Sequence, residues 1–368
     1  IARIMGEGRR EKAQEIFSLL IAATVVSGLV IAVISILFLP QIAAFLGAKG
    51  GMLADCIRYG RIILVALPFL MLQYAFGSLS VTAEKPKLGL IVTIISGVLN
   101  MTGDVLFMGV FHWGIAGAAI ASSVSEAVSV LFFILYTWKK VDYEKYGLFE
   151  YSGMDFRMLK QILGVSIWIM IQHGIAFLGW FVFFVVMEHQ GERSLAITNV
   201  VRSISSFLFM FVNAFASTSS SLVSNLIGAG KPEQVMGLCG RMIRICYYFV
   251  LPLGILIALF PELVLRIYTD NTDLIAGSVS SLWVMLSSYL IAVPAFIFFF
   301  SVSGTGNTQT ALLIDMASIF VYVLYALWVG IRIHADVAVC WTTEHVYDLM
   351  ILFAFFYLWK GNWQNKKL

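Results

Sequence analysis

The residues best suited to chemistry in this sequence are an amide and a carboxylate inside an apolar stretch. Asn100 and Asp104 are four residues apart, so on a helix both side chains project from one face. The chain is expected to turn near His112, and Asp104 precedes that turn by nearly as many residues as Ser122 follows it. An antiparallel helix pair would therefore bring the carboxylate, the amide and the hydroxyl group to one depth.

These groups offer oxygen ligands of the kind that hard cations prefer. Asn100, Asp104 and Ser122 can hold Na⁺, or Asp104 can carry a proton, and the sequence leaves both ions open. Glu126 follows Ser122 by one helical turn, and we expect it to join this cluster or to relay protons from it. The competing interpretation is a structural network of polar side chains that bonds neighbouring helices.

A second group of polar residues lies in the later part of the chain, and we assign it to a substrate cavity. It consists of Gln172, His173, Arg202, Asn213 and Tyr322. Histidine is the side chain most easily titrated near neutral pH, but a core histidine with satisfied hydrogen bonds is the competing interpretation. Arg202 lies about two turns inside its apolar run, where it can line the cavity, contact a carboxylate or extend to the outer interface.

Asp315 lies in a different setting, close to the cytoplasmic end of an apolar run. A carboxylate at such an end can still reach water. We therefore expect an interfacial role for Asp315 and not a role in ion coupling.

The elements that must position these residues are membrane-spanning helices. Of 368 residues, 60% are hydrophobic and 12% are charged, and the mean hydropathy is +0.91. One water-soluble domain cannot bury so much apolar surface. Apolar runs of about 20 residues follow one another with short breaks, unlike the alternating pattern of an outer-membrane barrel. The sequence therefore predicts an all-α polytopic membrane protein. The four cysteines have neither disulfide nor metal-site spacing.

We expect about ten spans. They cover residues 16–39, 60–83, 88–111, 114–138, 160–187, 195–227, 239–260, 279–303, 311–334 and 337–359. Lysine and arginine gather on the side of the first loop, so the positive-inside rule places that loop and the C-terminus in the cytoplasm.

A glycine-rich loop that occurs twice indicates that the chain is duplicated. Gly6 to Ala13 recurs at Gly228 to Val235, and each copy leads into a long apolar run. Pro68 and Pro294 occupy matching positions after the two copies, and each removes a backbone donor from its helix. We expect hinges at these prolines, with static bends as the alternative.

The repeat divides the chain into two pseudo-symmetric six-helix lobes. The N-terminal lobe covers 1–138, a cytoplasmic linker covers 139–159, and the C-terminal lobe covers 160–368. Because only four spans precede the linker, we expect that roughly 65 to 70 residues carrying two further helices belong upstream of Ile1.

Several segments, in this order and spacing, resemble the multidrug and toxic compound extrusion (MATE) family. They are Ile1–Ala13 with its copy Val223–Val235, then Asn100–Gly109, Gly114–Ala121 and Ser303–Thr308. The resemblance implies two six-helix lobes arranged as a V and drug efflux driven by inward Na⁺ or H⁺. It also implies a cation site in the first lobe, for which Asn100, Asp104 and Ser122 match three of the parts. Members that use acidic residues in the second lobe have them on the helix where this chain has Gln172 and His173.

The function that we expect is secondary active multidrug efflux, in which amphipathic organic cations leave in exchange for H⁺ or Na⁺ by alternating access. A flippase for lipid-linked saccharides is the alternative with the same fold, and it would need a more cationic cleft to hold pyrophosphate. A membrane-embedded enzyme or a channel fits less well, because no catalytic motif is evident and the duplication favours alternating access.

The remaining expectations concern partners and location. The protein is expected to need no cofactor, to act on small-molecule drugs and organic cations, and to bind no nucleic acid. We expect a monomer in the lipid bilayer of the bacterial plasma (inner) membrane, with several spans.

Overall fold

The computed structural model describes residues 7, 10–45, 49–82, 86–140 and 156–361. Within these ranges every regular element is a helix, and ten segments are long and apolar enough to cross a membrane. The all-α polytopic class and the number of spans are therefore confirmed. The chain forms two compact units, residues 1–159 and 160–368.

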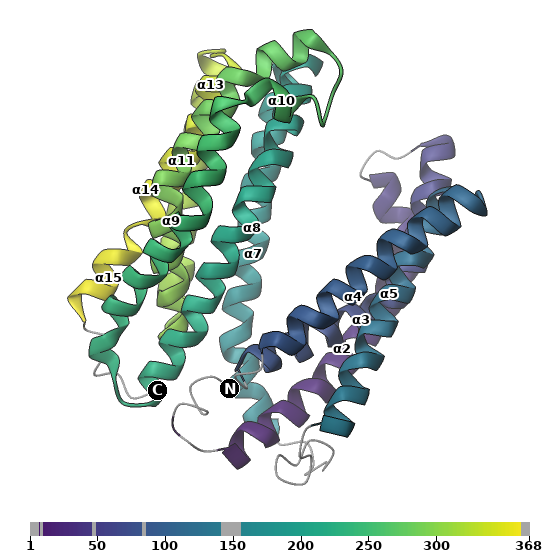
Figure 1. Ribbon diagram of the computed structural model, residues 1–368, viewed down its shortest axis with the longest axis vertical. Helices are drawn as coiled ribbons and strands as arrows, with labels where there is room; N and C mark the ends of the chain where they lie inside the picture. The colour runs from purple at the N-terminus through teal and green to yellow at the C-terminus, as the bar shows by residue number, and fades with distance from the viewer. Residues whose placement is uncertain (1–6, 8–9, 46–48, 83–85, 141–155, 362–368) are drawn as a thin grey trace. The chain divides into compact units, whose positions relative to one another are not determined.

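The first unit consists of long helices joined by short connections (Figure 1). Its α3 contacts the helices before and after it as well as α5, and α4 packs against α5. Leu88, Val92 and Phe133 form a small apolar core, and the Phe133 ring stacks on Phe76 with 5.6 Å between centroids. The described elements are α2 (Arg10–Phe45), α3 (Gly50–Thr82), α4 (Pro86–Asp104), the π-helical η1 (Val105–Val110) and α5 (Gly114–Lys140).

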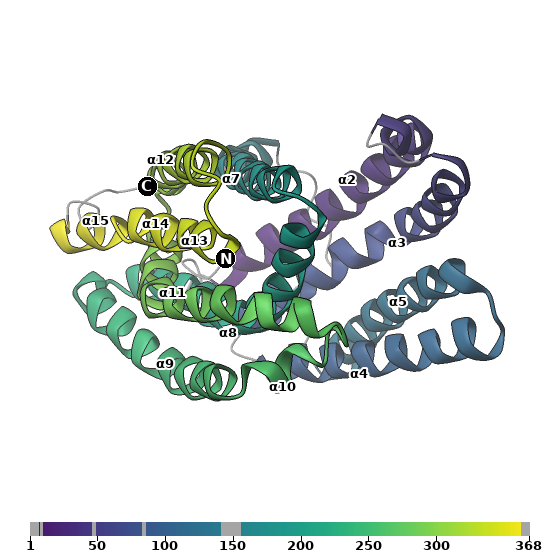
Figure 2. The same cartoon turned by 90° about the horizontal axis from the view of Figure 1, so that it is seen from above.

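The second unit has a more continuous core, built around α11. This helix contacts α8, α9 and α12 to α15, and Figure 2 shows it between α9 and α14. The described elements are α7 (Phe156–His189), α8 (Glu192–Gly228), η2 (Pro232–Gln234), α9 (Val235–Leu259), α10 (Pro261–Leu265), α11 (Thr272–Gly304), α12 (Thr308–Leu327), η3 (Trp328–Arg332), α13 (Val337–Cys340), α14 (Thr342–Ile351) and α15 (Ala354–Lys360).

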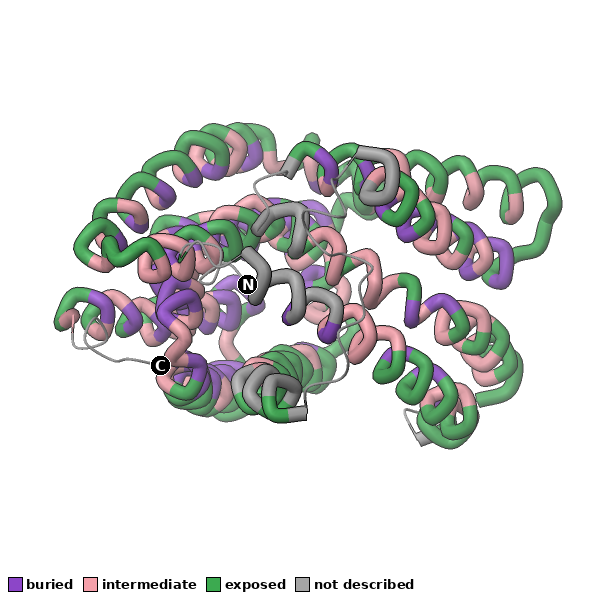
Figure 3. Tube along the Cα trace, turned by 90° about the horizontal axis from the view of Figure 1, so that it is seen from below, coloured by how far each residue is buried: buried purple, intermediate pink, exposed green. Residues whose placement is uncertain are grey.

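Burial follows the pattern expected for helices in lipid. Buried positions lie on one side of many helices and exposed positions on the other, as Figure 3 shows. Many exposed side chains are large and apolar, such as Leu37, Leu259 and Phe320 at 65%, 67% and 66% exposure. Exposed apolar side chains of this kind suit a helix that is surrounded by hydrocarbon.

The same irregular turn occurs once in each unit. The π-helical segments η1 and η3 are each followed by a histidine with positive φ, His112 at 55° and His334 at 52°. The residue after each histidine donates its N–H to the carbonyl oxygen six positions earlier, at 2.9 and 3.1 Å. A non-glycine residue rarely adopts positive φ, so a duplicated chain explains the coincidence well.

The last expected span, 337–359, is less regular than the sequence indicates. It consists of α13, α14 and α15, and the N–H groups of Phe353 and Phe355 bond three residues back at 3.1 and 2.9 Å. Such i to i−3 bonds tighten the chain relative to an α-helix.

The expected hinges and linker are only partly visible. Pro68 lies inside α3 and Pro294 inside α11, and their role as hinges stays a prediction. Residues 141–155 of the expected linker lie outside the described residues, as do positions 6, 8 and 9 of the first loop copy.

Candidate functional site

The first candidate site lies where α4 ends and faces α5. The Asn100 side-chain amide donates to Ser122 Oγ at 2.9 Å, so the structure brings together two of the predicted residues. This assignment leaves the Asn100 amide oxygen available to another partner. Asp104 is the last residue of α4, and its buried Oδ1 has no hydrogen-bond partner among the described residues.

Two glycines allow α4 and η1 to approach α5 closely. A Cβ at Gly103 would lie 2.8 Å from the Ala121 Cβ, and one at Gly117 would lie 2.9 Å from the Phe107 carbonyl carbon. Since real side chains do not fit at such distances, both positions must lack a Cβ for η1 and α4 to contact α5. Asp104, which follows Gly103, is held near α5 for this reason.

Glu126 also carries a buried oxygen without a partner. Its Oε2 receives no hydrogen bond from the described part of the chain, and the same holds for Asp104 Oδ1, so these two oxygen atoms are not bonded to each other. The described residues contain no group of three histidines, cysteines or acids that could hold a metal ion. Among the described residues the hydrogen bond at this site joins Asn100 to Ser122 and does not include Asp104, so the expected cation site of three oxygen ligands stays a prediction.

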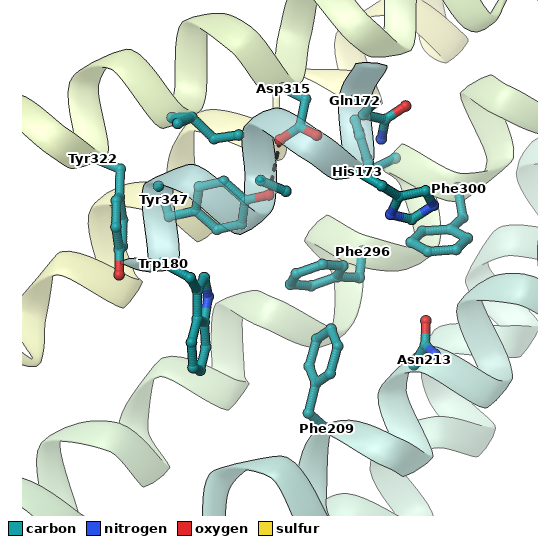
Figure 4. A pocket seen from close by; sticks show the side chains of 14 residues that line it. Gln172, His173, Trp180, Phe209, Asn213, Phe296, Phe300, Asp315, Tyr322 and Tyr347 are labelled. Carbon is teal, nitrogen blue, oxygen red and sulfur yellow. Dashed lines mark hydrogen bonds between the residues drawn. The ribbon is translucent and has the colours of Figure 1, made fainter. Parts of the chain in front are cut away.

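The second candidate site is a cavity of about 320 Å³ in the second unit (Figure 4). Four of the five residues assigned from sequence to a substrate cavity line it, namely Gln172, His173, Asn213 and Tyr322. Much of the remaining wall is aromatic and comes from Trp180, Phe209, Phe296, Phe299, Phe300 and Tyr347. Apolar and aromatic walls with a few polar groups are typical of small-molecule sites.

Asp315 also lines this cavity, contrary to the expectation that it reaches water. Its exposure is only 2%, and Tyr347 Oη donates to its Oδ1 at 2.9 Å. The reason is that α14, which carries Tyr347, packs against α12 and covers the carboxylate. In Figure 4 Asp315 lies at the same end of the cavity as Gln172 and His173.

Two further acids, Glu344 and Asp348, are carried by α14 and are not part of the cavity lining. Tyr322 Oη donates to Glu344 Oε1 at 3.2 Å. Asp348 lies one turn after Glu344 and is 3% exposed.

Arg202 does not line the same cavity as the other assigned residues. It lines a neighbouring cavity of about 410 Å³, which shares His173, Ala176 and Trp180 with the first. The Arg202 guanidinium carbon lies 4.4 Å from the Phe184 ring centroid and 5.7 Å from that of Trp180. Stacking of this kind is a cation–π interaction.

Comparison with known proteins identifies the family. The model of a family described as MatE matches residues 1–106 and 169–329, which is well over half of the chain. This chain belongs to the MatE family. The resemblance read from the sequence is confirmed, and a MatE protein is a transporter and not an enzyme.

Two relatives of this MatE protein have similar coverage. The Staphylococcus aureus (strain MSSA476) multidrug export protein MepA is 22% identical over 336 residues, which are 89% of this chain and 72% of the relative. The Bacillus subtilis (strain 168) probable multidrug resistance protein YoeA is 24% identical over 359 residues, which are 96% of this chain and 74% of the relative.

Solved structures share the fold. The outward-facing conformation of a multidrug resistance MATE family transporter of the MOP superfamily gives a TM-score of 0.90 at 18% identity, covering 98% of this chain and 81% of that one. A MOP superfamily transporter from Pyrococcus furiosus, whose structure is described as having reversed polarity of the binding pocket, gives 0.90 at 17% identity, covering 100% and 82%.

The acids on α14 are the functional candidates that sequence reasoning missed in this MatE protein. Glu344 and Asp348 are four residues apart within an apolar span, the same spacing that singled out Asn100 and Asp104. The high cost of a carboxylate at membrane depth was the available signal. The second unit therefore holds two buried acids, Asp315 and Asp348, together with the half-buried Glu344.

Proposed function

We propose that this MatE protein exports amphipathic organic cations in exchange for H⁺ or Na⁺ by alternating access. The observation that carries the proposal is the aromatic cavity with the buried Asp315 carboxylate in its wall. Aromatic faces and a carboxylate both attract an organic cation, and a mostly apolar wall accepts varied ring systems. The relatives named as multidrug export and multidrug resistance proteins support the same substrate class.

Ion coupling is assigned to Asp104, with Asn100 and Ser122 as neighbouring ligands and Glu126 as a relay. The buried Asp104 oxygen without a partner supports this assignment, because a buried carboxylate oxygen needs a proton, a cation or a donor. Binding of the cation at Asp104 would oppose binding of the drug, so that the inward gradient drives export.

The test is ethidium efflux from cells that express the protein, under separate Na⁺ and proton gradients. Asp104→Asn keeps the size of the side chain and removes its charge, so we expect gradient-driven efflux to fall to the level of cells without the protein. Asp55→Asn is the matched control, because Asp55 is an exposed acid near the start of α3. Undiminished, gradient-dependent export by Asp104→Asn would overturn the coupling role.

Further parts of the proposal concern organisation and location. The lobes are 1–138 and 160–368, the linker is 139–159, and the protein acts as a monomer in the bacterial inner membrane with a cytoplasmic C-terminus. The flippase alternative is not favoured. A pyrophosphate group calls for several cations, and the described residues that line the two cavities include one arginine and no lysine.

A further inference from the structure

Arg202 is a charged side chain inside a membrane span. No acidic side chain of the described residues forms an ion pair with it. Arg202 lies about 14 Å along α8 from Arg193, at a rise of 1.5 Å per residue. Arg193 is exposed and forms a bidentate ion pair with Asp273. Its Nε donates to Asp273 Oδ2 at 2.9 Å and its Nη2 donates to Asp273 Oδ1 at 3.1 Å. Within the described residues, the Arg202 guanidinium forms no ion pair and no hydrogen bond, and its recorded contacts are those with the Trp180 and Phe184 rings. The deeper arginine is therefore the one without a counter-charge.

Aromatic stacking alone does not satisfy this group. The Phe184 and Trp180 rings lie close to the guanidinium carbon, but neither ring carries an oxygen or nitrogen acceptor for the five N–H donors of the guanidinium. An arginine at membrane depth usually pairs with an acid or a carbonyl group, since leaving it unpaired is costly. The N–H groups of Arg202 are thus available to a ligand.

The cavity beside Arg202 has the walls of a site for an apolar molecule. Its volume is about 410 Å³, and it is lined by one face of α7 that carries Phe177, Trp180, Phe181 and Phe184. These positions recur at the spacing of a helical stripe. The lining contains no carboxylate among the described residues, and its other polar side chain, His173, lies near Asp315 at the far end.

We propose that Arg202 binds the anionic head of an amphipathic ligand whose apolar part lies against the aromatic face of α7. A planar guanidinium holds a carboxylate, sulfonate or phosphate with two parallel hydrogen bonds. One cation in the lining matches one negative charge on the ligand. The inference rests on the proposed export function and extends its substrates from organic cations to organic anions of the same size.

The same chemistry could come from a transported organic anion or from an anionic lipid headgroup. The experiment separates these sources by binding 1-anilinonaphthalene-8-sulfonate to the purified protein in nanodiscs of phosphatidylcholine, with and without phosphatidylglycerol. N-phenyl-1-naphthylamine, which has the same rings without the sulfonate, is the neutral probe. Binding is followed by fluorescence in the absence of any ion gradient.

We expect Arg202→Gln to weaken binding of the sulfonate probe by about tenfold to a hundredfold, the effect of losing a charge-assisted hydrogen-bond pair. The neutral probe should bind the variant as it binds the wild type, which also shows that the cavity is intact. Arg202→Lys should keep part of the affinity, because the charge remains while the planar fork is lost. Arg244→Gln, an exposed arginine on α9, is the control and should leave both probes unchanged.

The outcomes are distinct. Equal affinity of the wild type and Arg202→Gln for the sulfonate probe would overturn the proposal, and so would an equal loss for both probes. If phosphatidylglycerol competes with the sulfonate probe in the wild type but not in Arg202→Gln, the anion is a lipid headgroup. If it does not compete, the anion is a free organic ligand. Because no gradient is used, failure of ethidium export would count against the proposed function and leave this result standing.

Discussion

At the scale of single residues, the second unit holds its acids with tyrosines. Tyr347 donates to the buried Asp315 at 2.9 Å, and Tyr322 donates to Glu344 at 3.2 Å. A phenol on an adjacent helix can keep a carboxylate oriented in the wall of an apolar cavity. Of these two acids only Asp315 lines the cavity, where its carboxylate can contact a cationic ligand.

Mutation can measure how much the hydrogen bond between Tyr347 and Asp315 contributes to the free energy of unfolding. Tyr347→Phe removes the donor to a buried carboxylate, so we expect a loss of about 1.5–3 kcal/mol in stability, seen as a lower midpoint of thermal unfolding. Tyr325→Phe is the comparison, since the Tyr325 hydroxyl meets the neutral Thr342 Oγ1 at 2.9 Å. That variant should lose about 0.5–1.5 kcal/mol. Equal losses would contradict a charged Asp315.

At the scale of elements, the contact between α8 and α11 organises the second unit. The two helices pair along their length through Ser205 with Tyr289 and Ser219 with Ser301, at 3.1 and 2.9 Å. Small residues at such an interface let backbones approach and let hydroxyl groups bond between helices. This pairing explains why α8 carries Ser205 and Ser219 inside a membrane span.

A glycine sets the closest point of that contact. A Cβ at Gly304 would lie 2.5 Å from the Ser220 carbonyl oxygen, so Gly304→Ala must push the two backbones apart. We expect this change to cost about 1–3 kcal/mol, measured as a lower midpoint of thermal unfolding. Gly240→Ala on α9, where nothing lies within 4 Å of the added Cβ, should instead stabilise by about 0.5–1 kcal/mol. A neutral Gly304→Ala would show that α8 and α11 are not so tightly packed.

At the scale of the whole molecule, the proposed topology assigns each loop to one side of the membrane. It follows from the distribution of lysine and arginine along the chain, which biases insertion. The loop at 228–234 should face the cytoplasm and the loop at 266–272 the opposite side. Both loops belong to the second unit and expose polar residues, which makes them accessible to reagents.

Cysteine labelling in intact cells tests this topology. In a Cys56→Ser background, Asn271→Cys should react with a membrane-impermeant maleimide added outside, whereas Lys231→Cys should react only after the cells are opened. The native cysteines of the second unit should stay unlabelled because they are buried, namely Cys239, Cys246 and Cys340. The opposite pattern would invert the proposed orientation and place the C-terminus outside.

The sequence by itself determined those features that depend on local information. Hydropathy along the chain predicts the ten spans, because each span must satisfy its own backbone and match the bilayer. The pairing of Asn100 with Ser122 was also predictable, since a short hairpin sets the register of its two helices. The duplicated loop and the order of the motifs indicated the family, because both are properties of the sequence and need no knowledge of helix packing.

Tertiary structure decided the features that depend on which distant helices pack together. Asp315 was expected at the interface, yet α14 covers it with Tyr347, and no pattern within α12 reports that contact. Arg202 separates from Asn213 and Tyr322 into a neighbouring cavity, most of whose lining comes from residues of α7. A hydropathy pattern shows that a helix is apolar enough to span the bilayer, but it does not show which other helices that helix contacts. The choice of partner rests on close packing and on a few hydrogen bonds between segments far apart in the chain.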